Sequence, residues 1–288
     1  MTINVLMNGL GKMGTAVAKR LLQDDEIKIL GFIDPKPSTE EGKKLQNRFA
    51  TTIDITTKNI KSLSLKKLFK SYSGFPIIVD FSNTSACLTA CLYSAENGIN
   101  ILSGTTPIPQ DYEDQIKDAI SKYKIKGIRC PNFSPDVNKF LNELVPIAQN
   151  IDPSEDIAIH EIHRLEKAST SGTAALMAKI ICKHAGRPGY KLLMEGKAYN
   201  AEGIEIPMPE QKKDVLKKYI RISAERFADE PGMHTVTIGD EHNHRIHTVR
   251  ATRESYAEGA YRGIKFLSEA KEPRQYSFPE DVLKLSMF

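Results

Sequence analysis

The apolar and polar positions of the first part of the chain alternate between the spacing of strands and that of helices. Residues 3–7 form a short apolar run that ends in a glycine-rich turn, and residues 15–22 then place apolar side chains at helical spacing. Residues 27–33 form a second apolar run, which stops at Asp34-Pro35. Strand, glycine turn, helix and strand make a βαβ unit, so the pattern predicts a parallel sheet.

The same alternation continues to residue 130. Apolar runs predict strands at 77–81, 100–103 and 126–130, and helical periods separate them at 85–97 and 110–123. Repeated strand–helix alternation is typical of a doubly wound fold. We therefore predict a Rossmann-type α/β domain with a parallel sheet.

The pattern changes after Cys130-Pro131-Asn132, where strands begin to follow one another without helices. Such strands indicate an antiparallel or mixed sheet. We predict a dinucleotide-binding domain over residues 1–131 and 253–288, and a second α+β domain over 132–252. The elements expected beyond residue 132 are a helix over 137–148, a strand over 156–163, a helix over 171–185, strands over 219–227, 234–239 and 245–252, and a helix over 255–269.

Composition narrows the class of protein. The 288 residues suit two domains, and 40% hydrophobic with 26% charged residues exclude a disordered or fibrous chain. The net charge of +4 is weak, without a Lys/Arg block, and no apolar run reaches the roughly 18–20 residues of a membrane span. Four scattered cysteines are typical of reduced thiols. We expect a cytoplasmic enzyme (or one of the plastid stroma, if a transit peptide has been removed) that binds neither nucleic acid nor membrane.

Gly9-Leu10-Gly11-Lys12-Met13-Gly14 matches the pattern G-x-G-x-x-G directly after a strand and at the start of a helix. The glycines permit a tight turn, a close approach of a pyrophosphate, and close packing of helix on strand. An acidic residue, Asp34, stands twenty positions beyond Gly14, as expected for a ribose ligand. The turn predicts dinucleotide binding; the alternative is a tight turn without a ligand.

The choice between NAD and NADP stays open. Asp34 alone favours NAD, because a carboxylate repels a 2′-phosphate. Lys36 and Lys12 are positive charges that would offset this repulsion and admit NADP. The alternative for Lys36 is an ordinary exposed loop lysine.

Residues 160–174 leave a strand, pass through a charged turn and begin a helix. Ser171 has the chemistry of an N-cap, and the N–H groups of Gly172 and Thr173 can bind a substrate carboxylate. His163 and Lys167 in the preceding turn can supply protons while a hydride arrives elsewhere. The alternative is a capped helix that follows a surface loop.

Five motifs follow one another in a fixed order along nearly the whole chain, and a closing helix, A-T-R-E-S-Y-A-E-G-A, follows them. They are N-G-L-G-K-M-G, V-D-F-S, S-G-T-T, N-F-S, and E-x-H-x-x-x-K with S-G-T-A. In this order they resemble the 4-hydroxy-tetrahydrodipicolinate reductase (dihydrodipicolinate reductase) family of lysine and diaminopimelate biosynthesis.

The resemblance implies roles for individual residues. His163 would be the acid/base and Lys167 its proton-donating partner. The substrate would contact Arg164, Ser171, Gly172, Thr173 and Thr106. NADH or NADPH would contact Asn8, Gly9, Gly11, Lys12, Met13, Gly14, Asp34, Lys36, Phe81, Gly104, Thr105, Thr106, Cys130, Pro131, Asn132 and Phe133. The family also implies a cyclic dicarboxylate substrate, hydride transfer to ring C4 with loss of hydroxide, and a homotetramer built through the sheet of the second domain.

The sequence departs from the common bacterial pattern of the family. Arg164 stands where a second histidine is usual, and the stretch from Lys167 to Thr173 is one residue shorter and lacks an Asp. Asn8 replaces the first family glycine. These features look closer to the plant-type branch, and Arg164 is expected to grip a second carboxylate.

Other candidates point less clearly to chemistry. His242, His244 and His247 flank a predicted hairpin turn, where exposed histidines are more common than a zinc site, so we predict no metal. Arg253 either contacts substrate or pins the return to the first domain. Two other functions fit the domain plan: an amino-acid dehydrogenase acting on an acyclic substrate, and a non-catalytic nucleotide sensor.

Overall fold

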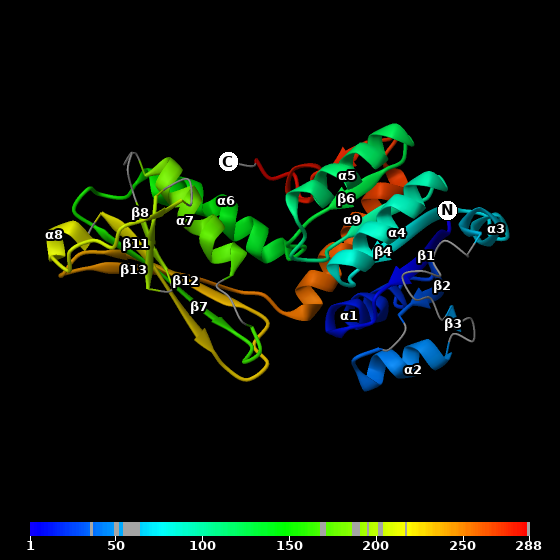
Figure 1. The fold of residues 1–288 in the computed structure, drawn as a ribbon, viewed down its shortest axis with the longest axis horizontal. Helices are drawn as coiled ribbons and strands as arrows, with labels where there is room; N and C mark the ends of the chain where they lie inside the picture. Colours follow the sequence, from blue (N-terminus) through cyan, green and yellow to red (C-terminus); the bar gives the residue numbers. More distant parts are fainter. Residues whose placement is uncertain are drawn as a thin grey trace. The chain divides into compact units, whose positions relative to one another are not determined.

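The computed structural model describes residues 1–34, 37–48, 52–53, 64–167, 171–185, 191–194, 196–200, 204–216 and 218–286. The chain divides into two compact units. Unit 1 comprises Met1–Pro135 and Arg253–Leu285, and unit 2 comprises Asp136–Thr252 together with the chain end from Ser286. Each unit has its own sheet and helices (Figure 1).

The sheet of unit 1 is parallel throughout its described strands. Its order is β14-β6-β5-β4-β1-β2-β3, and the inner part of this order is that of a Rossmann fold. The prediction of a doubly wound parallel sheet is therefore confirmed. The strands are β1 (Ile3–Asn8), β2 (Ile27–Ile33), β3 (Thr52–Ile53), β4 (Phe75–Asp80), β5 (Asn100–Ser103), β6 (Gly127–Arg129) and β14 (Gln275–Tyr276).

Helices cover both faces of this sheet. Since successive side chains of a strand point to opposite faces, neighbouring residues of β1 belong to different cores. Val5 of β1 belongs to a core shared with α1 (Lys12–Leu21) and α9 (Arg253–Glu269). Its neighbour Leu6 belongs to a second core shared with α4 (Thr84–Glu96) and α5 (Gln110–Lys122). Three short helices complete the unit: α2 (Glu40–Arg48), α3 (Leu65–Lys70) and the π-helix η2 (Phe278–Val282).

The sheet of unit 2 is mixed, as the run of strands without helices predicts. Its order is β10-β9-β8-β11-β7-β12-β13, with β7 parallel to β11 and antiparallel to β12. Helices α6 (Pro135–Gln149), α7 (Gly172–His184) and α8 (Lys213–Leu216) accompany it. The strands are β7 (Asp156–His163), β8 (Lys191–Met194), β9 (Lys197–Tyr199), β10 (Glu205–Ile206), β11 (Tyr219–Arg226), β12 (Met233–Gly239) and β13 (His244–Arg250).

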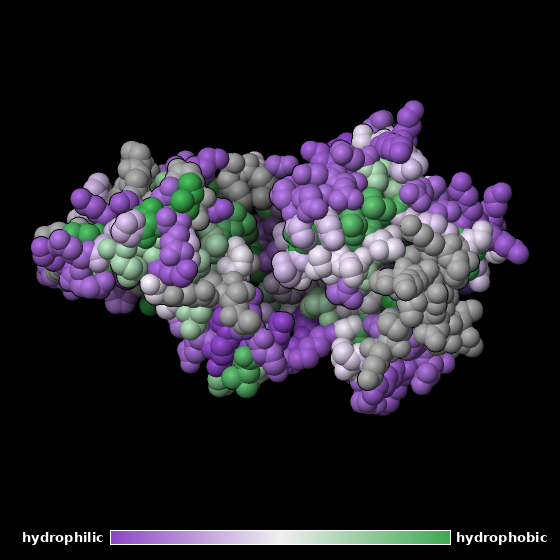
Figure 2. Space-filling view, viewed as in Figure 1, coloured by the Kyte–Doolittle hydropathy of each residue, from purple (hydrophilic) through white to green (hydrophobic). Residues whose placement is uncertain are grey.

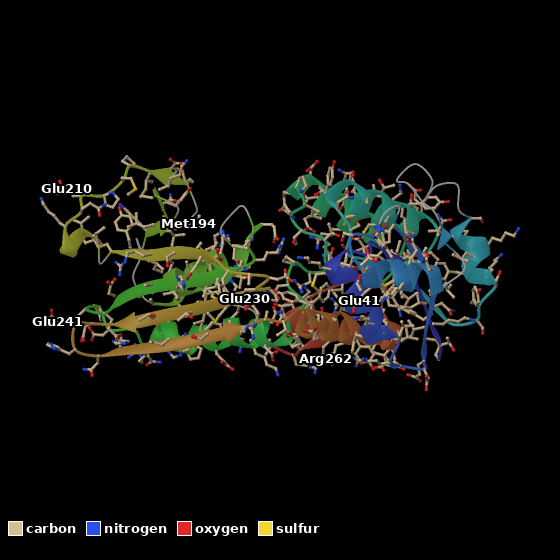
Figure 3. The ribbon with its side chains drawn as sticks, turned by 90° about the horizontal axis from the view of Figure 1, so that it is seen from below. Glu41, Met194, Glu210, Glu230, Glu241 and Arg262 are labelled. Carbon is tan, nitrogen blue, oxygen red and sulfur yellow. The ribbon has the colours of Figure 1, made fainter. Side chains whose placement is uncertain are left out.

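The long strands of unit 2 have two distinct ends. Glu241 marks the turn from β12 to β13 at one end of the sheet, and Glu230 marks the loop from β11 to β12 at the other (Figure 3). His163 is the last residue of β7, and its carbonyl accepts from the N–H of Phe227, just past the end of β11. The predicted chemistry of unit 2 therefore lies at the Glu230 end of the sheet.

Several short elements have no counterpart in the sequence prediction. β3, β8, β9, β10 and β14 have two to four residues each, too few to display a period. None of the described helices is long and apolar enough to cross a membrane. Polar side chains dominate the face shown in Figure 2, with smaller apolar areas between them.

Candidate active site

The glycines of the turn between β1 and α1 differ in what surrounds them. Gly9 has φ +93°, and a Cβ on it would collide with the backbone carbonyl of Phe81. A Cβ on Gly14 would collide with the carbonyl of Gly9. Among the described residues, a Cβ on Gly11 would meet only Ser38 Oγ, at 3.7 Å. Gly9 and Gly14 therefore close the turn, and Gly11 leaves the open backbone that a pyrophosphate needs.

The first turn of α1 presents a positive end. Its N-cap residue, Gly11, supplies no side-chain cap, and the turn contains no acidic residue. Lys12 in this turn is exposed, and Met13 is half-buried. Backbone N–H groups and the helix dipole both favour an anion at such a site. These residues fit the phosphates of a dinucleotide.

Asp34 follows the last residue of β2 and has a role within the turn itself. Its Oδ2 accepts a hydrogen bond from the N–H of Leu10 at 2.7 Å. The carboxylate that is predicted to bind the ribose is thus held against the glycine turn. Lys36 lies outside the described residues.

A buried carboxylate connects the ends of three neighbouring strands. Asp80 at the end of β4 is fully buried, and its Oδ1 accepts from Asn8 Nδ2 at 2.7 Å and from Ser82 Oγ at 2.5 Å. Its Oδ2 accepts from Ser103 Oγ and Thr105 Oγ1, both at 2.7 Å. The V-D-F-S and S-G-T-T motifs therefore meet at one charged centre, which fixes the backbone on which the predicted nicotinamide residues stand.

The predicted nicotinamide residues are partly brought together. The ring of Phe81 lies on Gly104, where a Cβ would collide with it. The Phe133 ring lies 6.0 Å from that of Phe81 and 4.9 Å from that of Phe278. Phe133 is only 1% exposed and belongs to the core, whereas Phe81 is half-buried and Thr106 is exposed. Phe81 and Thr106 thus remain the accessible members of this set.

The end of β6 and the residues that follow it support the loop that begins at Ser103. Arg129 donates to the carbonyls of Ser103 and Thr105 and pairs with Glu113 at 3.1 Å. Cys130 donates its thiol to the carbonyl of Asn132, and burial raises its pKa to about 12. The thiol is therefore unreactive at neutral pH. Pro131 is exposed and Asn132 half-buried.

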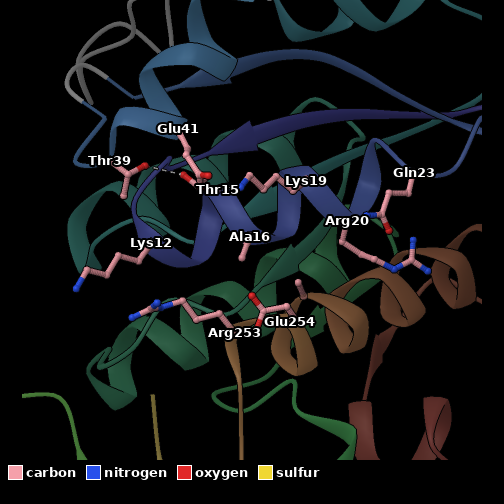
Figure 4. Close-up of a pocket in the computed structure, with 11 residues that line it drawn as sticks. Lys12, Thr15, Ala16, Lys19, Arg20, Gln23, Thr39, Glu41, Arg253 and Glu254 are labelled. Carbon is pink, nitrogen blue, oxygen red and sulfur yellow. Dashed lines mark hydrogen bonds and ion pairs between the residues drawn. The ribbon is translucent and has the colours of Figure 1, made fainter. Parts of the chain in front are cut away.

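A cavity of about 390 Å³ lies along α1 within unit 1 (Figure 4). Lys12 and Thr15 from α1, Thr39 before α2, and Arg253 and Glu254 from the start of α9 line it. Thr15 Oγ1 and Thr39 Oγ1 are linked at 3.2 Å. The cavity thus begins beside the glycine turn, and Arg253 contributes a guanidinium group to its wall.

In unit 2, His163 stands beside a buried carboxylate. Its side chain is 8% exposed, and its Nδ1 lies 3.6 Å from Oε2 of Glu161, whose side chain is fully buried. Both residues lie on the buried face of β7, because residues two apart in a strand share a face. Gly232 leaves room for the imidazole, since a Cβ there would lie 3.1 Å from His163 Nε2.

Burial and the neighbouring positive charges both lower the pKa of His163. Burial lowers its pKa to about 4, and the positive charges of Lys167, Arg226 and Arg164 add to this effect. His163 is therefore neutral at pH 7 in the ligand-free protein. The positive field that opposes protonation is the field that a doubly anionic ligand would neutralise.

Lys167 and Arg164 lie in the turn after β7. The N–H of Lys167 donates to the carbonyl of Arg164 at 3.1 Å, and the carbonyl of Lys167 accepts from Arg226 Nε at 2.7 Å. Arg164 is exposed and lies 3.8 Å from Glu166. Residues 168–170, in the stretch that is one residue shorter than in the common pattern, lie outside the described residues.

The start of α7 has the predicted N-cap. Ser171 Oγ accepts from the N–H of Thr173 at 3.1 Å, and no described residue lies within 4 Å of a Cβ placed on Gly172. The N–H of Ser171 donates to both oxygens of Glu161, at 3.0 and 2.9 Å. Ser171 therefore has structural partners of its own, and the exposed first turn is formed by Gly172 and Thr173.

The hairpin histidines are separate from this arrangement. His242 and His244 are exposed, and Asp240 Oδ1 closes the turn by accepting from the N–H groups of His242 and Asn243. The His, Cys, Asp and Glu side chains that lie close enough to share an ion, within the part of the chain that the structure describes, are Glu161, His163 and His234.

The sequence analysis assigned no role to the supporting residues Glu161, Arg226, His234, Asp80 and Arg129, although Glu161 and Asp80 stand in two of its motifs. Glu161 had one detectable signal, since it stands two positions before His163 on an otherwise apolar strand face. The others come from strands that are remote in sequence. Their partners follow only from the register of the sheets.

A glycine turn that fits a dinucleotide in one unit, a buried histidine in the other and the family matches of both units together indicate the class of protein. It is an NAD(P)H-dependent oxidoreductase. Residues 3–133 match the family description "Dihydrodipicolinate reductase, N-terminus", and residues 137–283 match "Dihydrodipicolinate reductase, C-terminus". The chain belongs to the dihydrodipicolinate reductase family, which confirms the resemblance of its motifs; membership of the plant-type branch stays a prediction.

Two relatives and one solved structure illustrate this relationship. The chain is 30% identical over 295 residues to the 4-hydroxy-tetrahydrodipicolinate reductase of Methanococcus maripaludis strain C7, which covers 99% of this chain and 100% of that one. It is 27% identical over 289 residues to that of Methanocaldococcus jannaschii, covering 99% and 98%. A dipicolinate-bound dihydrodipicolinate reductase from Paenisporosarcina sp. TG-14 has the same fold, with a TM-score of 0.64, 18% identity and coverage of 96% and 98%.

Proposed function

We propose that the chain reduces 4-hydroxy-tetrahydrodipicolinate to tetrahydrodipicolinate with NADH or NADPH, and that His163 and Lys167 handle the protons. Family membership over both units supports the reaction. The observation that carries the assignment of residues is the buried His163, 3.6 Å from the fully buried Glu161, with Lys167, Arg226 and Arg164 as the positive charges that help to lower its pKa. These positive charges would attract a dicarboxylate, and its binding would in turn raise the pKa of His163.

The residues of unit 1 would hold the dinucleotide. Gly11 and the first turn of α1 would receive the pyrophosphate, and Asp34 the adenosine ribose. Phe81 and Thr106 would border the nicotinamide. When bound, the reduced nicotinamide supplies a hydride to ring C4.

The residues of unit 2 would hold the substrate. The name of the Paenisporosarcina structure gives dipicolinate, a flat cyclic dicarboxylate, as the ligand of that protein. We extend this class of ligand to the present chain. One carboxylate would lie at Gly172 and Thr173, where backbone N–H groups begin α7, and Arg164 would bind the other.

Substrate charge would then recruit the proton. A dicarboxylate beside Lys167 and Arg226 offsets the positive charges that lower the pKa of His163, so this pKa rises toward neutrality on binding. His163 and Lys167 can then donate the proton with which the C4 hydroxide leaves as water. Overall, one hydride and one proton enter, and water and the oxidised cofactor leave.

Oligomeric state and location form part of the same proposal. β13 is an edge strand of the unit 2 sheet, and its Ile246 is 60% exposed. An edge strand leaves backbone N–H and C=O groups open to pairing with another chain, and we propose a homotetramer built through this sheet. Cys87, Cys91, Cys130 and Cys182 are free, which supports work in the reducing cytoplasm.

The deciding experiment measures oxidation of NADH and NADPH with enzymatically generated 4-hydroxy-tetrahydrodipicolinate. Turnover that requires this compound supports the reductase. Turnover only with acyclic amino acids or keto acids would favour the amino-acid dehydrogenase instead. Cofactor binding without turnover on either class of compound would favour a nucleotide sensor.

A further inference from the structure

The buried face of the unit 2 sheet changes from apolar to polar toward the Glu230 end. β12 lies antiparallel to β7, and three of its buried side chains stand directly opposite three of β7. The first two pairs are aliphatic, and the third is a histidine facing a glutamate. These pairs are Ile238 with Ile157, Val236 with Ile159, and His234 with Glu161.

The histidine–glutamate pair converges on Ser171, the N-cap residue of α7. His234 Nε2 lies 3.1 Å from Ser171 Oγ and 3.8 Å from Glu161 Oε2. Glu161 accepts twice from the N–H of Ser171. Ser171 in turn caps α7 through Thr173. The N–H and the hydroxyl of Ser171 are therefore both bound by side chains of the sheet.

The surroundings of His234 select its protonation state. Its Nδ1 is buried and has no hydrogen-bond partner among the residues that the structure describes, whereas Nε2 faces the Ser171 hydroxyl. Burial lowers the pKa of His234 to about 3. A neutral ring with its proton on Nε2 makes the available hydrogen bond and leaves only a lone pair unmatched at Nδ1.

The ring of His234 also contacts the proposed acid. The two imidazoles of His163 and His234 pack edge to face with centroids 5.1 Å apart. Movement of His234 would therefore displace both the start of α7 and the ring of His163. We propose that His234, paired with Glu161, is a positioning residue that fixes Ser171 and His163 for the reaction; this inference rests on the proposed function.

Glu161, His163 and His234 could instead be considered as metal ligands, since their nitrogen and oxygen atoms lie within 4.8 Å of one another. The local charges oppose a cation. Arg226 Nη1 lies 3.5 Å from Glu161 Oε1, and Lys167 lowers the pKa of both histidines. A field that repels a proton also repels a divalent metal ion. Positioning is therefore the role that the observations favour.

The test compares two replacements of His234 in the full-length chain. Leucine has a similar volume but no donor, and glutamine retains an N–H that can reach Ser171. We expect H234L to lower kcat/KM roughly 10- to 100-fold, through a higher KM for 4-hydroxy-tetrahydrodipicolinate as α7 shifts and a lower kcat as His163 shifts, because misplaced groups reduce the rate by such factors. We expect H234Q to retain most of the activity. NADPH affinity should be unchanged in both.

A double-variant cycle tests whether His234 acts through Ser171. H234L and S171A should be non-additive, since either one removes the same hydrogen bond. The matched control is H160Q on the opposite face of β7, where His160 contacts Ser223. It should behave as the parent protein. Circular dichroism and the melting temperature establish that each variant is folded.

Three results would overturn the proposal. The first is an unchanged KM and kcat in folded H234L. The second is a loss in H234Q as large as that in H234L. The third is loss of activity with a chelator, restored by Zn²⁺, which would establish a metal site. Failure of the proposed function is distinguishable, because full activity of H163A would remove His163 from the mechanism whatever the His234 variants do.

Discussion

Asn8 Nδ2 donates to Asp80 Oδ1 at 2.7 Å, and this bond ties the end of β1 to the end of β4. The common bacterial pattern of the family has glycine at the position of Asn8, and glycine has no side chain that could donate. The departure therefore adds a donor to a carboxylate that is fully buried.

Replacing Asn8 should consequently destabilise the protein. We expect Asn8→Ala to lower the free energy of unfolding of unit 1 by about 1.5–3 kcal/mol, the usual range for a hydrogen bond to a charged group. Urea denaturation followed by circular dichroism measures this difference. Asn200→Ala, a change at a half-buried loop position of unit 2, is the control. Equal effects of the two changes would contradict this account of Asn8.

The glycines of the turn should respond differently to substitution. A side chain at Gly11 enters open space, so Gly11→Val should weaken NAD(P)H binding roughly tenfold or more and leave the fold intact. Gly14→Ala should instead lower the melting temperature, because its Cβ meets the Gly9 carbonyl. Fluorescence titration and thermal denaturation measure the two effects. Unchanged affinity in Gly11→Val would remove the dinucleotide from this turn.

Cofactor choice should respond to two side chains in opposite directions. Lys36→Ala removes a positive charge that a 2′-phosphate would meet, so the Kd for NADPH should rise more than that for NADH. Asp34→Ala should mainly weaken NADH, and it should also lower stability, because Asp34 accepts from Leu10. Binding titrations with both cofactors decide this point. If both changes affect NADH and NADPH equally, neither side chain contacts the adenosine ribose.

The proton-handling residues should affect turnover rather than cofactor affinity. His163→Ala and Lys167→Ala should each lower kcat by roughly 10²–10⁴, the range for loss of a general acid or base. Lys167→Ala should also raise KM, since its charge attracts the dicarboxylate. Arg164→Ala should raise KM with kcat little changed. Steady-state kinetics separate these outcomes, and full activity of both His163→Ala and Lys167→Ala would reduce the turn to a capped helix start.

Stability should decline in mild acid. The pKa values of His163 and His234 in the folded protein, about 4 and about 3, lie below the unfolded value of about 6.5. Their contribution to stability is therefore present above pH 6.5 and is lost as the pH falls toward 4 and 3, because the unfolded chain takes up protons first. The melting temperature should fall between pH 7 and pH 5. In His234→Leu it should fall less steeply, and an identical slope would contradict this assignment.

The sequence predicts the parts of the fold that have a period. Strand β2 and strand β7 have the predicted bounds, because each displays a run or an alternation over seven or eight residues. The glycine turn was also predictable, since its three glycines have separate steric reasons. The partners of Asp80 and of Glu161 were not, because they depend on which strands lie side by side. A buried carboxylate has no local pattern that names its donors.

Unit 1 is made of two stretches of chain, and all of unit 2 except its last residues is encoded between them. On the ribosome, β1 to β6 are synthesised first, whereas α9, whose Ile264 and Leu267 share a core with Val17, is synthesised only after Thr252. At about 5–20 residues synthesised per second, the apolar face of the first sheet lacks α9 for roughly ten seconds. A premature stop after Thr252 would remove only the last residues of unit 2 but would release unit 1 without α9, as an aggregation-prone fragment.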